Sequence, residues 1–268
     1  MPTTVNSVSN PRIRYLRSLH DARTRRREGV YFVEGVRLVE EALNADLEPR
    51  LALIEAAQLD ATERGQALAA RLLGLEDQGR LELLYVNQRV MRAVSDLVTP
   101  PGVLAIVPER PWQGGDLGPF ALVLDRLQDP GNAGTILRSA EAAGIVSSVV
   151  AIESVDLYSP KVVRAAMGAH FYLPLWADGA TWPLLYERLK GRPLLATRAK
   201  AGIPYYHVDW RRPLALVIGN EAHGLSPEAA AVATEWVTIP MAGHAESLNA
   251  SVAAGILLFE AARAKRGE

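Results

Sequence analysis

Apolar residues in the second part of the chain gather in short continuous runs that alternate with helical segments. The segment 133–144 has the spacing of alanine and leucine that is typical of a helix, and a last helical pattern covers 248–263. The apolar runs cover residues 120–125, 147–153, 171–176, 193–199, 214–219 and 235–241. Because strands covered by helices on both faces are continuously apolar, the pattern predicts an α/β fold with a parallel sheet.

The first part of the chain has a different pattern. Helical spacing covers 34–45 and 61–77, and short strand-like runs cover 51–56, 81–86 and 103–107. This mixture predicts a small α/β domain. The domain is expected to span 29–107, a linker rich in proline and glycine 108–118, and the parallel-sheet domain 119–268.

Charge is unevenly distributed, although the 268 residues carry 29 basic and 30 acidic side chains and a formal net charge of −1. Residues 1–28 contain seven arginines against two acidic residues, whereas 29–110 carry a net −5 and 111–268 a net −1. Arginine favours forked contacts to phosphate. We therefore predict a basic N-terminal arm over 1–28; the alternative is a solvated helix face.

Several classes of chemistry lack their residues. The chain has no cysteine, which excludes disulfides, thiolate metal sites and cysteine nucleophiles. Dinucleotide and phosphate-binding glycine loops and the Gly-x-Ser-x-Gly signature are absent, and the five histidines show no metal-ligand spacing. We expect no metal site. The N-terminus lacks an apolar signal, and no apolar run is long enough to span a bilayer, which predicts a cytoplasmic protein without membrane association.

Three polar clusters follow the predicted strands at their carboxyl ends, where open α/β sheets bind ligands. In the first cluster, Asn132 is placed to cap the following helix, Gly134 permits a close backbone approach, and Arg138 falls in the early turns. Arg138 could reach back toward the loop and its ligand. Taken alone, this cluster is equally an ordinary strand–turn–helix with a surface arginine.

The second and third clusters also carry polar residues that a turn alone does not explain. Glu221 stands between glycines after the strand 214–219. After the strand 235–241, Ser247 is placed to cap the last helix, and Asn249 lies just inside that otherwise apolar helix. A turn explains the glycines and a cap explains the serine. Neither explains the glutamate or the asparagine.

The order of these residues resembles a known family. Asn132-x-Gly134…Arg138, Gly219-x-Glu221-x-x-Gly224 and Ile239-Pro240-Met241…Ser247-Leu248-Asn249 are similar to the three motifs of the SpoU/TrmH RNA ribose 2′-O-methyltransferases of the SPOUT superfamily. Residues 29–107 resemble the family's L30e-like substrate-binding domain, at Phe32–Gly35 and Pro100–Ala105. The resemblance implies a SPOUT catalytic domain with a trefoil knot, which is a rare topology.

The resemblance also implies a cofactor, an assembly and site residues. The cofactor is S-adenosylmethionine, and the enzyme is a homodimer whose site forms where two knots pack together. The positions that match cofactor-binding residues are Thr197, Gly219, Ile239, Met241 and Leu248. The positions that match catalytic residues are Arg138 and its supporting set Asn132, Glu221, Ser247 and Asn249.

The chemistry of the implied reaction favours one role for Arg138. A sulfonium methyl is already activated, so the difficulty is the ribose 2′-hydroxyl, which must be held in line while negative charge develops on its oxygen. A guanidinium stays protonated in proteins and is a poor base. We therefore expect Arg138 to bind the adjacent phosphate and to stabilise the oxyanion, while Asn132 and Asn249 orient it.

The implied substrate is structured RNA. We favour ribosomal over transfer RNA, because the L30e-like domain resembles RNA-binding domains of ribosomal proteins. The predicted RNA contacts are the arginines of the N-terminal arm, namely Arg12, Arg14, Arg23, Arg25, Arg26 and Arg27. Two alternatives remain open at this point: a non-catalytic RNA-binding dimer, and a knotted methyltransferase that acts on an RNA base.

Overall fold

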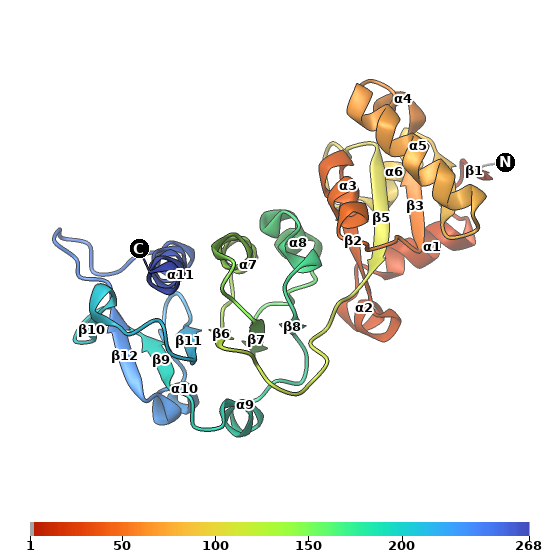
Figure 1. The fold of residues 1–268 in the computed structure, drawn as a ribbon. Coiled ribbons are helices and arrows are strands. Elements are labelled where there is room, and N and C mark those ends of the chain that lie inside the picture. Colours follow the sequence, from red (N-terminus) through yellow and green to blue (C-terminus); the bar gives the residue numbers. More distant parts are fainter. Residues whose placement is uncertain (1–2, 268) are drawn as a thin grey trace. The chain divides into compact units, whose positions relative to one another are not determined.

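The computed structural model describes residues 3–267, which form two compact units (Figure 1). Unit 1 comprises Met1–Glu109 and Tyr158–Phe171, and unit 2 comprises Arg110–Leu157 and Tyr172–Glu268. The chain thus changes unit at residue 109, inside the expected linker. The segment 158–171 belongs to unit 1, which the expected domain boundaries did not include.

Unit 1 is built on a five-stranded mixed sheet with the order β1-β4-β3-β5-β2. β1 and β3 run parallel to β4, while β5 runs antiparallel to both β3 and β2. The strands are β1 (Thr3–Val5), β2 (Val30–Glu34), β3 (Leu51–Ile54), β4 (Glu82–Val86) and β5 (Val103–Pro108). The helices are α1 (Pro11–Ser18), α2 (Ala22–Glu28), α3 (Val36–Asn44), α4 (Ala56–Leu59), α5 (Glu63–Asp77), α6 (Gln88–Val94), α8 (Pro160–Ala166) and the short 3₁₀ turn η1 (Ala169–Phe171).

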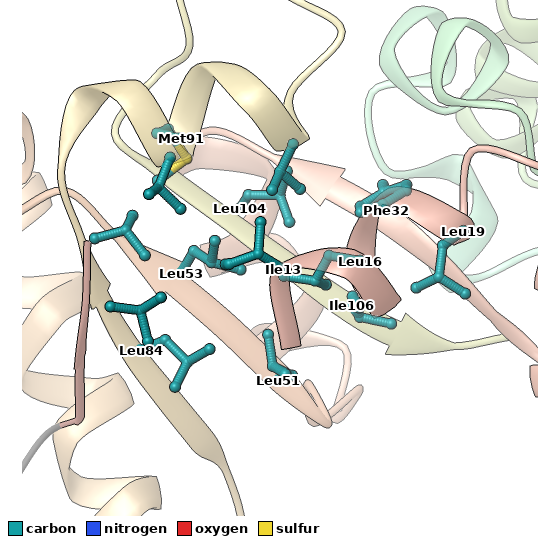
Figure 2. Close-up of a cluster of buried hydrophobic side chains, with 14 of the residues drawn as sticks. Ile13, Leu16, Leu19, Phe32, Leu51, Leu53, Leu84, Met91, Leu104 and Ile106 are labelled. Carbon is teal, nitrogen blue, oxygen red and sulfur yellow. The ribbon is translucent and has the colours of Figure 1, made fainter. Parts of the chain in front are cut away.

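Helices cover both faces of this sheet. On one face, α1 and α6 bury Ile13, Leu16 and Met91 against strand residues such as Phe32 and Leu53 (Figure 2). Successive strand residues point to opposite faces, so the neighbours of Phe32 and Leu53 face the other side. α3 and α5 pack there against β2, β5 and β4, and their buried residues lie outside the first cluster.

Residues 3–28 are folded into unit 1 and do not form a separate arm. β1 pairs with β4, and Ile13, Leu16 and Leu19 are fully buried. These apolar positions recur every three residues, which places them on one side of α1 and leaves the intervening arginines outside. The segment is not the expected free arm because this apolar side of α1 is buried in unit 1.

Unit 2 contains a seven-stranded, entirely parallel sheet, as the continuous apolar runs predict, with the order β10-β12-β9-β11-β6-β7-β8. Its strands are β6 (Phe120–Asp125), β7 (Ser148–Ile152), β8 (Leu175–Trp176), β9 (Leu194–Thr197), β10 (Ile203–Pro204), β11 (Leu214–Ile218) and β12 (Glu235–Thr238). The run 171–176 forms only the two-residue β8, because Phe171 belongs to η1 and Pro174 lacks the N–H of a ladder residue.

Two pairs of helices cover the faces of the parallel sheet. α7 (Pro130–Ala143) and α11 (Ala250–Arg266) pack together on one face, and α9 (Trp182–Leu189) and α10 (Pro227–Val232) lie on the other (Figure 1). Trp182 and Leu185 pack there with Val123 and Val217. The 3₁₀ turn η2 (Tyr205–His207) contacts α11. Among the described residues, none of the helices has both the length and the apolar character needed to cross a membrane.

Candidate functional site

The loops at the carboxyl ends of the parallel strands surround the main cavity of unit 2. The cavity has a volume of about 390 Å³ and lies between the loops that follow β9, β11 and β12 and the first turns of α11. The structure brings all of the predicted cofactor-binding residues to its lining: Thr197, Gly219, Ile239, Met241 and Leu248. Segments that lie up to 51 positions apart in the sequence therefore share one site.

A tight backbone turn forms one wall of this cavity. Asn220 and Gly224 donate and accept two backbone hydrogen bonds with each other, at 2.8 and 3.0 Å. Gly224 has a φ of +68°, and a Cβ on Gly219 would lie 2.7 Å from the backbone of Gly224. Only glycine fits at position 219, so the peptide groups there remain open to a ligand.

The remaining lining combines apolar side chains with a few charges. Ile218, Val237 and Leu257 supply apolar surface, as an adenosine-sized ligand requires. The guanidinium of Arg198 lies 4.7 Å from the ring centre of Trp236 and donates to the carbonyl of Ala201. The cavity therefore combines apolar and backbone surface with the guanidinium of Arg198 and the carboxylates of Glu221 and Glu246. This lining fits an uncharged nucleoside with a charged tail.

A chain of hydrogen bonds joins the three sequence motifs beside the cavity. The side-chain N–H of Asn249 donates to Oδ1 of Asn132 at 2.9 Å, and Nδ2 of Asn132 donates to Oε1 of Glu221 at 3.0 Å. The backbone N–H groups of Gln128 and Asp129 also donate to the Glu221 carboxylate, at 3.4 and 3.3 Å. These residues come from three separate segments, namely the start of α7, the loop after β11 and the cap of α11, and form one polar network.

The network keeps Glu221 ionised. Partial burial alone would raise the pKa of Glu221, but the hydrogen bonds from Asn132 and from the Gln128 and Asp129 backbone outweigh it and lower the pKa below the ordinary glutamate value. A carboxylate with a lowered pKa accepts hydrogen bonds and is a poor proton donor near neutral pH. The carboxylate of Glu221 is therefore an acceptor for Asn132 and for the backbone N–H groups of Gln128 and Asp129.

Both predicted helix caps differ from those in the structure. Asp129 caps α7 by accepting from the backbone N–H of Asn132 at 2.7 Å, so the amide of Asn132 is available for the network. Asn249 caps α11 by accepting from the backbone N–H groups of Ser251 and Val252. Ser247 lies before the cap and lines the cavity. In both loops, a polar residue three or two positions from the predicted cap performs the capping.

Arg138 lies apart from this network within one chain. It is exposed on α7, it does not line the cavity, and its side chain makes no hydrogen bond or ion pair within residues 3–267. The exposed Thr135 one turn earlier marks the same outward face of the helix. The expectation that Arg138 reaches back to its own loop is not met in a single chain.

Sequence reasoning missed Asp125, which supports the site from below. This carboxylate is fully buried at the end of β6 and accepts from the backbone N–H of Ser226 at 2.6 Å, the Ser226 hydroxyl at 2.9 Å and Nε1 of Trp182 at 3.2 Å. Ser226 in turn caps α10. The sequence did contain a signal for this residue, because Asp125 is a charged residue at the end of an otherwise apolar strand.

The predicted RNA-binding arginines fall into different environments. Arg14, Arg23 and Arg26 are exposed. Arg12 forms an ion pair with Glu82 at 2.7 Å, and Arg27 pairs with the adjacent Glu28 at 3.1 Å.

Arg25 requires a correction, because its side chain is buried inside unit 1 and is not exposed for an RNA contact. It is only 3% exposed, and Nη1 donates to the carbonyls of Leu19 and His20, each at 2.7 Å. These carbonyls follow the C-terminus of α1, where orphan acceptors need donors. Arg25 thus closes the end of α1.

Comparison with known families assigns both parts of the chain. The profile of the SpoU rRNA Methylase family matches residues 119–259, and that of the MRM3-like substrate binding domain matches residues 10–105. The chain belongs to the SpoU rRNA methylase family. The substrate-binding match begins at residue 10, in agreement with the packing of α1 into unit 1.

Relatives of this SpoU-family chain match it along almost its full length. An uncharacterized tRNA/rRNA methyltransferase of Synechocystis is 34% identical, over 97% of this chain and 93% of that protein. The 23S rRNA (guanosine(2553)-2′-O)-methyltransferase of Bacillus subtilis is 28% identical, over 95% of this chain and 97% of that protein. An AdoMet-bound rRNA methyltransferase from Sinorhizobium meliloti superposes with a TM-score of 0.81 and 32% identity, covering 98% of each chain.

Proposed function

We propose that this SpoU-family protein transfers a methyl group from S-adenosylmethionine to a ribose 2′-hydroxyl of ribosomal RNA. The observation that carries the proposal is the network of Asn132, Glu221 and Asn249 beside a cavity lined by the matching cofactor positions. One relative over nearly the whole chain, and others over part of it, are named as 23S rRNA 2′-O-methyltransferases, which favours ribosomal RNA and the ribose over a base.

The residues present fit S-adenosylmethionine. The peptide groups around Gly219 and the apolar side chains of Ile239 and Leu248 would hold its adenosine, and Arg198 offers a positive charge to its carboxylate. When bound, the cofactor supplies an electrophilic methyl. The chain itself must position the ribose oxygen and exclude competing water.

The polar network and Arg138 have distinct roles in this proposal. Asn132 and Asn249, held by the ionised Glu221, present fixed amides that position the substrate ribose. Arg138 binds the neighbouring phosphate and stabilises the negative charge that develops on the 2′-oxygen. The step breaks the sulfur–methyl bond and forms the oxygen–methyl bond, and the hydroxyl proton passes to solvent.

A homodimer is the second part of the proposal, because Arg138 lies outside the cavity of its own chain. Val252 and Phe259 on α11 are half exposed, at 50% and 49%, and stand seven residues apart on one side of the helix. α7, which carries Arg138, packs directly against α11. We propose that a second copy covers this apolar stripe and that Arg138 of each copy serves the cavity of the other.

The experiment compares Arg138→Ala with the wild type and with Arg188→Ala, an exposed arginine on the opposite helical layer. Tritiated S-adenosylmethionine is incubated with a 23S rRNA transcript, and modified nucleosides are identified. Arg138→Ala should lose methyl transfer by about 10² or more, with cofactor binding unchanged by calorimetry, while Arg188→Ala keeps both. Near-normal turnover of Arg138→Ala would refute the assigned role. A methylated base, or no incorporation by the wild type, would refute the proposed reaction.

The oligomeric state has a separate test. Phe259→Glu places a charge in the proposed apolar contact and should convert the dimer to a monomer in analytical ultracentrifugation. Mixing an inactive Arg138→Ala chain with a chain inactive through Asn249→Ala should restore one functional site per mixed dimer. A monomeric wild type, or no restoration, would contradict the shared site.

The trefoil knot is a further element of this proposal, supported by the strand order. The chain passes from β11 to β12 beyond β9, and then returns so that α11 packs against α7 and η2. η2 lies in the loop that joins β9 to β11. We propose that the segment 239–249 threads this loop. Stretching with optical tweezers should give a contour length short of the full 268 residues; the full length would contradict a knot.

We also propose that the protein works in the cytoplasm and meets ribosomal RNA or its precursors there. Cell fractionation with immunodetection should recover it with ribosomes or ribosomal precursors. Recovery in a membrane or secreted fraction would contradict this location.

A further inference from the structure

Two helices of unit 1, α1 and α6, lie side by side with their corresponding ends together. Near their starts, Nδ2 of Asn87 donates to Oδ1 of Asn6 at 3.3 Å. Near their ends, Nε2 of His20 hydrogen-bonds to the carbonyl of Val94 at 2.7 Å. Asn87 caps α6 and Val94 is its last residue, so the two bonds fix a parallel pair of helices.

Both helices bury their apolar sides in the same core. Ile13 and Leu16 of α1 and Val90, Met91 and Val94 of α6 belong to one cluster on one face of the sheet (Figure 2). Their opposite sides therefore face solvent together. Packed helices are spaced by about 8–10 Å, so residues on the two outer sides form adjacent rows.

These outer sides carry arginines without partners. Arg14 and Arg17 on α1 are three residues apart, as are Arg89 and Arg92 on α6, so each pair lies on one side of its helix. All four are exposed, and their side chains form no hydrogen bond or ion pair with any residue in 3–267. The two helices contain five arginines and no acidic residue, and only Arg12 is paired, with Glu82.

The opposite helical layer of unit 1 has the reverse balance. α3 and α5 together contain three arginines and five acidic residues. Arg64 there forms an ion pair with Glu40, and Arg71 donates to Asn44 at 3.0 Å. The unpaired positive charge therefore belongs to one layer and is not a general property of the unit.

We infer that the surface formed by Arg14, Arg17, Arg89 and Arg92, the α1–α6 surface, is where the phosphate backbone of the substrate RNA binds. This inference rests on the proposed function and adds the part of unit 1 that binds the RNA substrate. Four guanidinium groups in two adjacent rows match a repeating polyanion, because each can form forked hydrogen bonds to a phosphate. Arg89 and Arg92 lie far from the arginine-rich N-terminus in sequence, and the fold alone brings them to Arg14 and Arg17.

The test measures binding of a 23S rRNA transcript across about 50 to 200 mM salt, because each lost phosphate contact reduces the slope of log K against log salt by about 0.7–0.9. The variants are R14Q/R17Q, R89Q/R92Q and the quadruple variant. The control is R37Q/R71Q, which removes two exposed arginines from the opposite layer. We expect each double variant to reduce the slope by about 1.5 and the quadruple variant by about 3, with the control unchanged.

Kinetics and cofactor binding separate this surface from the proposed reaction. The quadruple variant should raise the KM for RNA, leave kcat near the wild-type value at saturating RNA, and bind S-adenosylmethionine normally. An unchanged salt slope in the quadruple variant, with an active wild type, would overturn the surface and leave the function intact. A wild type that binds no RNA would overturn the function itself.

Other polyanionic partners are distinguished with the same variants. Binding of wild-type protein to phosphatidylglycerol vesicles that exceeds its RNA binding, and that the quadruple variant loses, would assign the surface to a lipid and refute the inference. Equal loss of RNA binding in the R37Q/R71Q control would show diffuse charge attraction, which also refutes a defined surface.

Discussion

The polar network of Asn132, Glu221 and Asn249 in unit 2 and the α1–α6 surface of unit 1 differ in whether their polar side chains have partners within the chain. In the network, Asn132, Glu221 and Asn249 bond to one another and to the backbone, so each side chain has one fixed position. On the α1–α6 surface, Arg14 and Arg89 have no partner in the described chain. A fixed geometry suits a reaction at one atom, and an unpaired cationic surface suits a long polyanion.

The two regions differ in what substitution should cost. Below the network, Asp125 is fully buried, and its removal leaves buried donors unsatisfied, which costs about 1–3 kcal/mol for each group. Removing an exposed, unpaired arginine changes stability by about 0.5 kcal/mol or less. Stability and RNA binding should therefore respond to different sets of residues, and the following substitutions test that separation.

The largest expected effect on stability comes from Asp125→Ala, below the network. This substitution leaves two donors of Ser226 and the indole N–H of Trp182 buried without an acceptor. We expect unit 2 to lose about 3 kcal/mol or more of unfolding free energy in urea denaturation. Asp209→Ala removes an exposed carboxylate bonded only to the nearby Arg211 backbone and is the control. Equal costs for the two would contradict the supporting role of Asp125.

The next largest effect is expected from Arg25→Met, which tests the division among the N-terminal arginines. The buried guanidinium donates to Leu19 and His20, and bonds to a charged donor contribute about 1.5–3 kcal/mol. We expect a loss of that size in the stability of unit 1 and little direct change in the salt slope of RNA binding. Arg23→Met, at an exposed position two residues earlier, should leave stability nearly unchanged. An Arg25→Met variant that keeps its stability but has a reduced salt slope would show that Arg25 contacts RNA and does not stabilise unit 1.

Much of the fold followed from local patterns in the sequence, whereas the predicted site positions came from the resemblance to the family's motifs. Continuous apolar runs predict the parallel sheet, and polar residues after three of its strands predict where the loops gather. The five predicted cofactor-binding positions line one cavity because carboxyl ends of parallel strands meet at one edge of the sheet. Asn132 and Glu221 are 89 positions apart and meet for the same reason, because each follows the carboxyl end of a strand in this sheet.

The features that sequence reasoning missed depend on contacts between distant segments. Arg25 stands in a run of arginines, and the sequence does not distinguish it from its exposed neighbours. It is buried because the end of α1 lies beside α2 and offers it the carbonyl of Leu19. The pairing of α1 with α6 places Arg89 and Arg92 beside an N-terminal helix, which no local pattern indicates. The segment 158–171 joins unit 1 through packing of α8 on β2.

A smaller effect on stability separates the cap of α11 from the residue that precedes it. Asn249→Ala removes the acceptor of two backbone N–H groups and should cost about 1 kcal/mol of stability, along with most of the methyl transfer. Ser247→Ala should cost less than half of that, because Asn249 provides the cap. Thermal unfolding and the tritium assay measure the two effects. A larger stability loss for Ser247→Ala would contradict the observed cap.

The smallest expected effect is the dependence of the network on pH. The pKa of Glu221 is lowered in the folded protein, so its contribution to stability is fully present above the ordinary glutamate pKa and is lost as pH falls from there through the folded value. Near neutral pH, the difference in Tm between the wild type and Glu221→Gln should therefore be constant, and it should shrink only in acid. R14Q/R17Q leaves the network and its carboxylate intact and should show no such change. A Tm difference that already declines near neutral pH would mean that Glu221 is not held ionised by Asn132 and the backbone.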